Sequence, residues 1–281
     1  MKFYSPLRYP GGKNKLARFI AKICVDNKVN GHYVEPYAGG ASVALYLLLE
    51  GYVSEITVND IDRSIFAFWH SVLNRTQSFC ELIRKTEITV ETWQKMKEIQ
   101  KNKEKAKLLD LGFSVFFLNR TNVSGIINGG IIGGKDQKGK YKIDCRFNKD
   151  ELIKRIKEIA RHRKNIHLYQ MDAVELIYKI SKNKKTIFYF DPPYYLKGKS
   201  LYVNYYKHDD HKKVSEEIKN IKNAKWIVSY DDVSEIRKMY KGYNDLAFSY
   251  FYTARDARRG KEILFSSANL IVEKVIEPTK I

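Results

Sequence analysis

The chain has 281 residues, which is enough for one α/β core together with an inserted or appended subdomain. Its 51 basic residues outnumber its 32 acidic residues, and the net charge of +19 favours a polyanionic partner such as nucleic acid; a lysine-biased proteome is the alternative explanation of this excess. No apolar run approaches the roughly 20 residues of a membrane-spanning helix, and the N-terminus lacks the apolar centre of a signal peptide, so we expect a soluble cytoplasmic protein.

The first predicted unit covers residues 32–60. The segment "HYVEPYAGGASVALYLLLEGY" indicates a short strand, a glycine turn and an apolar helix that begins near Ala41, and "EITVND" indicates a second strand. This is a βαβ pattern in which both strands end in carboxylates, Glu35 and Asp60. Because open α/β sheets bind ligands at the carboxyl ends of their strands, we expect the cofactor site there.

The pattern changes to amphipathic helices over residues 64–148, as in "ETWQKMKEIQKNKEKAKLLDLGFSVFFL". A glycine-rich segment follows, and together they predict a helical insertion that ends in an exposed β-hairpin. Strand and helix alternation then resumes with "IHLYQMDAVELIYKI", "TIFYFDPPY" and "AKWIVSYDD". The predicted α/β domain is therefore discontinuous, with residues 1–63 and 149–281 interrupted by an inserted domain of residues 64–148.

The run "IFYFDPPY" ends a buried strand with a carboxylate, Asp191, followed by two prolines. Pro192 and Pro193 fix the backbone and remove two amide donors, which leaves nearby carbonyls as acceptors. A carboxylate beside such a carbonyl can accept both hydrogens of an exocyclic amino group, and Tyr194 offers a flat face for a base. The alternative is a plain strand-terminating turn, since Asp-Pro and Pro-Pro are common turn dipeptides.

Two further features bear on metals and assembly. His208 and His211 lie three residues apart but have no further histidine or cysteine at ligand spacing, and the three cysteines have no CxxC spacing, so we expect no metal site and no disulfide framework. No heptad or exposed apolar stripe is evident, so we expect a monomer.

Several motifs, taken in chain order, carry a family resemblance. They are "RYPGGK" at 8–13, "VEPYAGGA" at 34–41, "ND" at 59–60, "LNRTNVSGI" at 118–126, "MDA" at 171–173 and "FDPPY" at 190–194. Together the sequence resembles the Dam-type, D12 class (α-group), S-adenosylmethionine-dependent DNA adenine-N6 methyltransferases over nearly its whole length. The resemblance implies a Rossmann-like methyltransferase sheet with an inserted DNA-recognition subdomain, and a site-specific enzyme that methylates N6 of a flipped adenine in duplex DNA.

The resemblance also implies an S-adenosylmethionine site. Its expected residues are Tyr9, Gly11, Lys13, Glu35, Pro36, Gly39, Gly40, Asp60, Asp172 and Asp191. Tyr9 matches the aromatic that packs on the cofactor's adenine, and Lys13 matches a lysine near the cofactor and the target base. Glu35 would face the ammonium group of the cofactor, while Gly39 and Gly40 would let the backbone approach its methionine part.

Two of these acids have competing interpretations. Asp60 matches the acid that accepts from the ribose hydroxyls, and Asp62 competes for that role if the strand continues to it. Asp172 matches the acid that accepts from the cofactor's adenine amino group, but it would also suit the N-cap of the following helix. Capping and binding can coexist.

The expected DNA-binding residues follow from the same resemblance and from the basic segments. They are Asn119, Arg120, Asn122, Ser124, Asn128, Lys140, Lys142, Arg146, Arg258, Arg259 and Lys261. Asn128 stands where members that methylate GATC have a guanine-reading arginine, so GATC is doubtful as the target. The basic residues suit phosphate contacts, with solvated surface charge as the alternative for each.

Two other functions stay open on the sequence. The same Pro-Pro-Tyr geometry could serve cytosine-N4 methylation of DNA or adenine methylation of RNA. A DNA-binding subunit that has lost catalysis would keep the scaffold, but the intact "DPPY" argues against it. The sequence leaves open the recognition site, processivity, a preference for hemimethylated DNA and a cognate restriction endonuclease.

Overall fold

The computed structural model describes residues 2–8, 12–180, 184–196, 206–252 and 258–273. Its centre is a seven-stranded sheet with the strand order β3-β2-β1-β4-β5-β7-β6. The strands are β1 (His32–Glu35), β2 (Glu55–Asn59), β3 (Ile166–Tyr169), β4 (Thr186–Phe190), β5 (Lys225–Asp231), β6 (Asn244–Tyr252) and β7 (Arg258–Ser266). Strands β1 to β5 are parallel, whereas β7 runs antiparallel to both β5 and β6.

Apolar residues point to both faces of this sheet because helices cover both. On β4, Ile187 and Tyr189 belong to one buried cluster, whereas Phe188 and Phe190 belong to another. The first face is covered by α1 (Ala17–Asp26) and α2 (Ser42–Leu49), and the second by α8 (Ala173–Lys179), α10 (His208–Lys219) and α11 (Ser234–Met239). This alternation explains why the central strands read as continuous apolar runs.

The order of the parallel strands reverses between β1 and β4. From β1 the chain proceeds through β2 to β3 on one side, and from β4 to β5 on the other. This reversal is the topological switch point at which open α/β sheets bind ligands. Glu35 ends β1 and Asp191 follows β4, so the two carboxylates flank that point. The expected Rossmann-like α/β sheet is confirmed.

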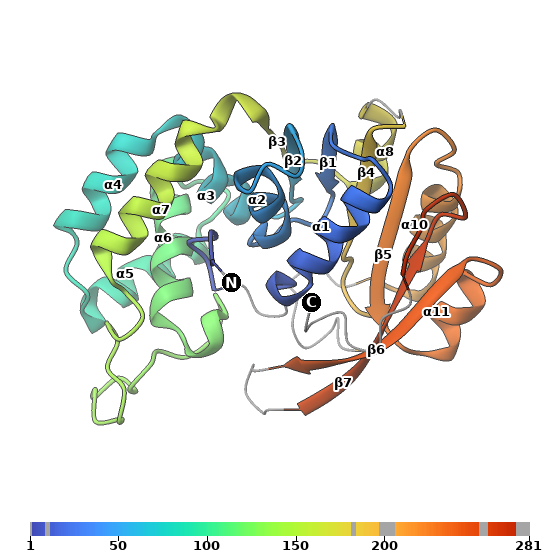
Figure 1. The fold of residues 1–281 in the computed structure, drawn as a ribbon. Coiled ribbons are helices and arrows are strands. Elements are labelled where there is room, and N and C mark those ends of the chain that lie inside the picture. The colour runs from blue at the N-terminus through green and yellow to red at the C-terminus, as the bar shows by residue number, and fades with distance from the viewer. Residues whose placement is uncertain (1, 9–11, 181–183, 197–205, 253–257, 274–281) are drawn as a thin grey trace.

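Helices α3 to α7 form a separate layer beside the sheet (Figure 1). They are α3 (Arg63–Asn74), α4 (Thr76–Lys85), α5 (Val90–Lys101), α6 (Leu108–Thr121) and α7 (Lys149–Arg161). The Phe68, Phe79 and Phe116 rings join α3, α4 and α6, with ring centroids 5.5 to 6.2 Å apart. Helix α7 packs on α3 and α4, although it follows residue 148, where the sequence suggested that the inserted domain ends.

The β-hairpin expected after α6 is not formed. Residues 122–148 contain one isolated bridge, Asn122 to Ile131, and the short turn η2 (Val123–Gly125), but no strand. Several residues of the segment have positive φ, including Ser124 at 56° and Gly125 at 75°. Positive φ interrupts an extended ladder, so the glycines and Ser124 form a compact loop instead.

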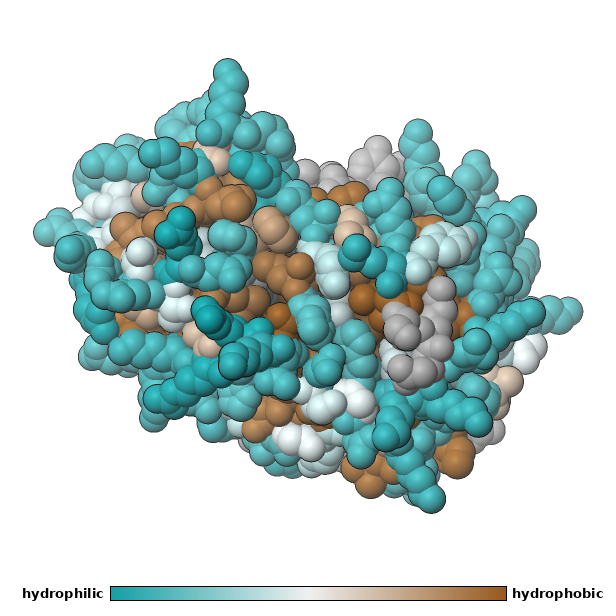
Figure 2. Space-filling view, turned by 90° about the horizontal axis from the view of Figure 1, so that it is seen from above, coloured by the Kyte–Doolittle hydropathy of each residue, from teal (hydrophilic) through white to brown (hydrophobic). Residues whose placement is uncertain are grey.

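Two short 3₁₀ turns, η1 (Asn14–Leu16) and η3 (Arg163–Asn165), complete the described elements. Hydrophilic side chains cover most of the face shown in Figure 2, with hydrophobic ones visible toward its centre. Among the described residues, no helix has the length and apolar content needed to cross a bilayer.

Candidate functional site

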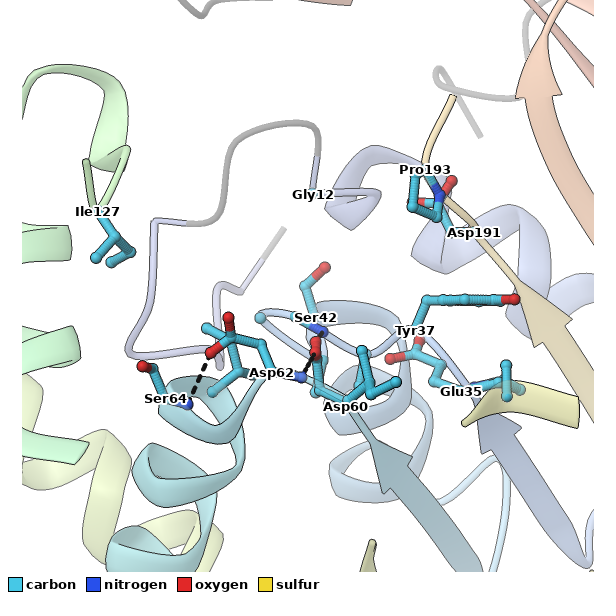
Figure 3. Close-up of a pocket in the computed structure, with 18 of the residues that line it drawn as sticks. Gly12, Glu35, Tyr37, Ser42, Asp60, Asp62, Ser64, Ile127, Asp191 and Pro193 are labelled. Atoms are coloured by element: carbon cyan, nitrogen blue, oxygen red, sulfur yellow. Dashed lines mark hydrogen bonds between the residues drawn. The ribbon is translucent and has the colours of Figure 1, made fainter. Parts of the chain in front are cut away.

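A cavity of about 540 Å³ lies at the carboxyl ends of the parallel strands (Figure 3). Its wall combines the β1–α2 turn, the end of β2, the β3–α8 turn and the residue after β4. The helical layer contributes Gln100, Lys103 and residues 125–128. Of the expected cofactor residues, the cavity brings together Lys13, Glu35, Pro36, Gly39, Gly40, Asp60, Asp172 and Asp191. Tyr9 and Gly11 lie outside the described residues.

Glu35 is a buried carboxylate whose oxygen Oε1 accepts from the Tyr33 hydroxyl at 3.0 Å and from the Ala44 amide at 3.1 Å. Burial raises the pKa of Glu35 to about 8, while these two hydrogen bonds partly oppose the rise. A cation beside Glu35 would favour its charged form. Glu35 therefore suits the ammonium end of an amino-acid ligand.

The glycine turn brings the backbone close to the end of β2. Gly39 has a φ of 45°, and its amide donates to Asp60 Oδ2 at 3.1 Å. Oδ1 of Asp60 accepts from the Asp62 amide at 3.0 Å. Burial raises the pKa of Asp60 to about 7. Each oxygen of Asp60 keeps a second lone pair with which it can accept from a ligand hydroxyl.

Asp62 does not continue the strand, as one interpretation of the sequence required. Strand β2 ends at Asn59, and Asp62 caps α3 by accepting from the Ser64 amide at 2.7 Å. Its other oxygen faces Lys103 Nζ at 3.2 Å. Asp62 still lines the cavity, but its carboxylate already serves a helix cap and an ion pair.

Asn59 links the backbone segments at the base of the site, a role that was not predicted from the sequence. Its fully buried amide donates to the carbonyls of Pro36 at 2.8 Å and Met171 at 3.0 Å. Its Oδ1 accepts from the Met171 amide at 3.1 Å. Asn59 therefore ties the ends of three neighbouring strands together, and its place in the "ND" motif was the available signal.

Asp172 caps α8, as the alternative interpretation proposed. Its Oδ1 accepts from the Val174 amide at 2.8 Å, and the residue also lines the cavity. The cap uses one carboxylate oxygen. Capping therefore leaves room for a ligand amino group, and the two interpretations remain compatible.

Asp191 lies at the opposite wall from Asp60 and Asp62 (Figure 3). Its Oδ1 accepts from Ser229 Oγ on β5 at 2.7 Å and lies 3.4 Å from Lys13 Nζ. Burial raises the pKa of Asp191, Lys13 opposes the rise and Glu262 adds to it. Within the described part of the chain, Oδ2 receives no hydrogen bond. That oxygen is therefore available to an incoming donor.

The rest of the "DPPY" run is less open than the sequence suggested. Pro193 lines the cavity, but Pro192 and Tyr194 are buried outside its wall. The Tyr194 hydroxyl donates to Glu262 Oε1 at 2.6 Å, and Lys13 Nζ lies 4.7 Å from the centre of its ring. A base could stack on Tyr194 only after this part of the chain moved. Tyr37, which the sequence reasoning passed over, is an aromatic that does line the cavity.

Three expected DNA-binding residues have internal structural roles instead. Asn119 is buried and bonds the Arg8 backbone at both its amide, 2.6 Å, and its carbonyl, 3.2 Å. Arg120 is 9% exposed and donates to the Pro6 carbonyl at 2.7 Å. Asn122 is buried and accepts from Trp93 Nε1 at 2.6 Å. Because their polar groups are satisfied inside the protein, these three residues are not positioned for DNA contact in this structure.

The other DNA-binding candidates lie at the surface or at the cavity. Asn128 is exposed and lines the main cavity, whereas Ser124, Lys140 and Arg146 line a shallower depression beside it. Lys142 and Lys261 are exposed. The side chains of Arg258 and Arg259 lie outside the described residues.

The cavity has the size and the polar lining of a small-molecule cofactor site. Its volume is within the range of small-molecule sites, and carboxylates occur at both the β1 and the β2 strand ends, with Glu35 buried and Asp60 half-buried. The glycine turn allows close backbone approach between them. In the described residues, no group of three or more histidine, cysteine or acidic side chains could hold a metal ion.

Fold and site together define a Rossmann-like α/β enzyme with a cofactor-sized cavity at the switch point of its sheet. Residues 9–254 match the family model of the D12 class N6 adenine-specific DNA methyltransferases, and the chain belongs to this family. The family resemblance of the motifs is thereby confirmed. The protein is an adenine-specific DNA methyltransferase and therefore uses a methyl donor.

Individual relatives are distant. The Type II methyltransferase M.MjaIII of Methanocaldococcus jannaschii is 23% identical over 262 residues, covering 85% of this chain and 88% of the relative. A solved structure from Pyrococcus horikoshii, described as a candidate RNA methyltransferase, is 10% identical with a TM-score of 0.44, covering 92% of this chain and 85% of that one. Spermidine synthase of Thermotoga maritima is 8% identical with a TM-score of 0.38, covering 92% and 59%.

Proposed function

We propose that the protein transfers a methyl group from S-adenosylmethionine to N6 of an adenine flipped out of duplex DNA at a specific site. The observation that carries this proposal is the position of Asp191, which follows a buried strand at the switch point and faces a cavity with Glu35, Asp60 and Asp172 around it. A carboxylate held at the wall of a cofactor-sized cavity can orient a substrate amine against a bound cofactor.

Each cavity residue has a role in this proposal. Glu35 would take the cofactor's ammonium group, Asp60 its ribose hydroxyls and Asp172 its adenine amino group. The glycine turn would contact the methionine part through backbone atoms. S-adenosylmethionine, when bound, supplies an electrophilic methyl group on its sulfonium.

Asp191 and the Pro192 carbonyl would accept the two hydrogens of the adenine amino group, so that its lone pair points toward the cofactor. The raised pKa of Asp191 also suits it to take the proton that N6 loses after methylation. Flipping costs a few kcal/mol of unstacking, which contacts with the base edge and an aromatic ring would offset. Tyr194 would provide that ring after the movement described above, with Tyr37 as the aromatic already at the cavity.

The helical layer and the loop 122–148 would contact the duplex. The net charge of +19 supports binding to phosphates, with Lys140, Lys142 and Arg146 exposed on the loop. We propose that the target-recognition part spans residues 64–148 together with α7, which packs on it, and that the remaining residues form the catalytic part. Cytoplasmic location, a monomeric state and a cognate restriction endonuclease stay predictions.

The test is to incubate the protein with S-adenosylmethionine and unmethylated genomic DNA, digest the DNA to nucleosides and identify the product by mass spectrometry. Deoxy-N6-methyladenosine is expected. If methylated cytosine is found instead, the target base is cytosine and not adenine. If a product forms only with RNA, the substrate is RNA and not DNA. Asp191→Ala should abolish the product while cofactor and DNA binding persist; an active variant would overturn the role of Asp191.

A further inference from the structure

A largely buried ion cluster at the cavity wall joins Lys13, Asp191, Tyr194 and Glu262, which come from three separate parts of the sequence. Glu262 on β7 is fully buried, and its Oε1 accepts from the Tyr194 hydroxyl at 2.6 Å and lies 3.2 Å from Lys13 Nζ. The Lys13 ammonium also donates to the Tyr194 oxygen and lies 3.4 Å from Asp191 Oδ1. One ammonium group therefore bridges two carboxylates beneath the turn that presents Asp191.

Glu262 itself lies outside the cavity wall. A carboxylate without solvent exposure is costly to keep unless its charge is matched, so this position is not explained by packing alone. β7 holds it opposite Asp231 of β5, and Asp231 accepts from the Tyr195 and Leu196 amides at 2.9 Å each. From this pair of strands, Glu262 holds Tyr194 at the end of the "DPPY" run and Asp231 holds the two residues that follow it.

We propose that Glu262 is a positioning residue for methyl transfer: it holds the Lys13 ammonium and the Tyr194 hydroxyl in place, and through Lys13 it sets the orientation and charge environment of Asp191. This inference rests on the proposed function of Asp191. It assigns Glu262 no contact with cofactor or base.

The charged groups around Asp191 predict the direction in which its pKa should shift when one of them is removed. The titratable groups that act on it are Lys13, Glu35, Tyr189, Tyr230 and Glu262, and Tyr194 contacts both Lys13 and Glu262. Of these, Lys13 lowers the pKa of Asp191 and Glu262 raises it. If Asp191 must be ionised to accept the amino group, the methylation rate falls as pH falls through its pKa.

The experiment measures single-turnover methylation of duplex DNA against pH for the wild-type protein, Glu262→Gln and Lys13→Met. Glu262→Gln keeps the side-chain shape but removes the charge. The acidic limb of the pH–rate profile of this variant should therefore move to lower pH. Lys13→Met removes the opposing charge, so its limb should move to higher pH. Both variants should lose about tenfold or more in single-turnover rate, with cofactor affinity of Glu262→Gln changed less than about threefold.

Glu50→Gln is the matched control. Glu50 accepts from the Tyr4 hydroxyl at the same 2.6 Å but lies away from the cavity, so this variant should behave as wild type. A wild-type rate and an unmoved acidic limb in Glu262→Gln would overturn the inference, as would limbs of Glu262→Gln and Lys13→Met that move together.

Two further outcomes are covered, a variant that does not fold and a wild-type protein that does not methylate adenine. If Glu262→Gln failed to fold, Lys13→Met would decide, because it removes the ammonium through which Glu262 acts on Asp191. A wild-type rate together with an unmoved acidic limb in Lys13→Met would refute the inference. Absence of methylated adenine with the wild-type protein would instead reject the proposed function.

Discussion

Two roles compete for Asn119, a structural role inside the protein and a DNA-reading role. Replacing Asn119 with alanine tests which of the two is correct. Its side chain makes three hydrogen bonds, two to the Arg8 backbone and one to the Gly125 carbonyl at 2.9 Å. At about 0.5–1.5 kcal/mol each, their loss should lower the free energy of unfolding by roughly 3 kcal/mol. For a chain of this size, that corresponds to a fall in Tm of roughly 6–12 °C.

The assay is urea denaturation followed by circular dichroism, combined with methylation of a library of DNA sites. Asn128→Ala is the comparison, because Asn128 is exposed at the cavity and should change the preferred site while leaving stability within about 0.5 kcal/mol of wild type. Asn119→Ala should show the opposite pattern. A stable Asn119→Ala with an altered site preference would refute the structural role.

Two further predictions concern charge. The pKa of Glu35 is about 8 in the folded protein against an ordinary 4.5, so the folded state binds the extra proton and the unfolding free energy should fall as pH rises between these values. Glu35→Gln should reduce this dependence of the unfolding free energy on pH, as measured by urea titrations at about pH 5 and about pH 8. An unchanged difference between the two pH values would contradict the burial argument. Arg146→Ala should weaken binding to all duplexes and reduce the slope of log K against log salt by about 1, as measured by fluorescence anisotropy. An unchanged slope would show that Arg146 contacts no phosphate.

The sequence by itself determined the central strands of the sheet and the acids at their carboxyl ends, where the cavity lies. Continuous runs such as "TIFYF" must bury side chains on both faces of a sheet. The acids at the ends of β1, β2 and β4 lie at one edge because parallel strands share one carboxyl edge. Glu35, Asp60 and Asp191 could therefore be found from local pattern and motif alone.

Only the tertiary structure decided what lies between those elements. Asn119 and Asn122 looked like DNA readers, yet their polar groups are satisfied by Arg8 and Trp93, partners that no local pattern links to them. The same is true of Glu262, whose partners Lys13 and Tyr194 are 249 and 68 residues away. Burial and long-range pairing depend on how the helical layer and the last strands pack, and residue spacing along the chain does not encode that.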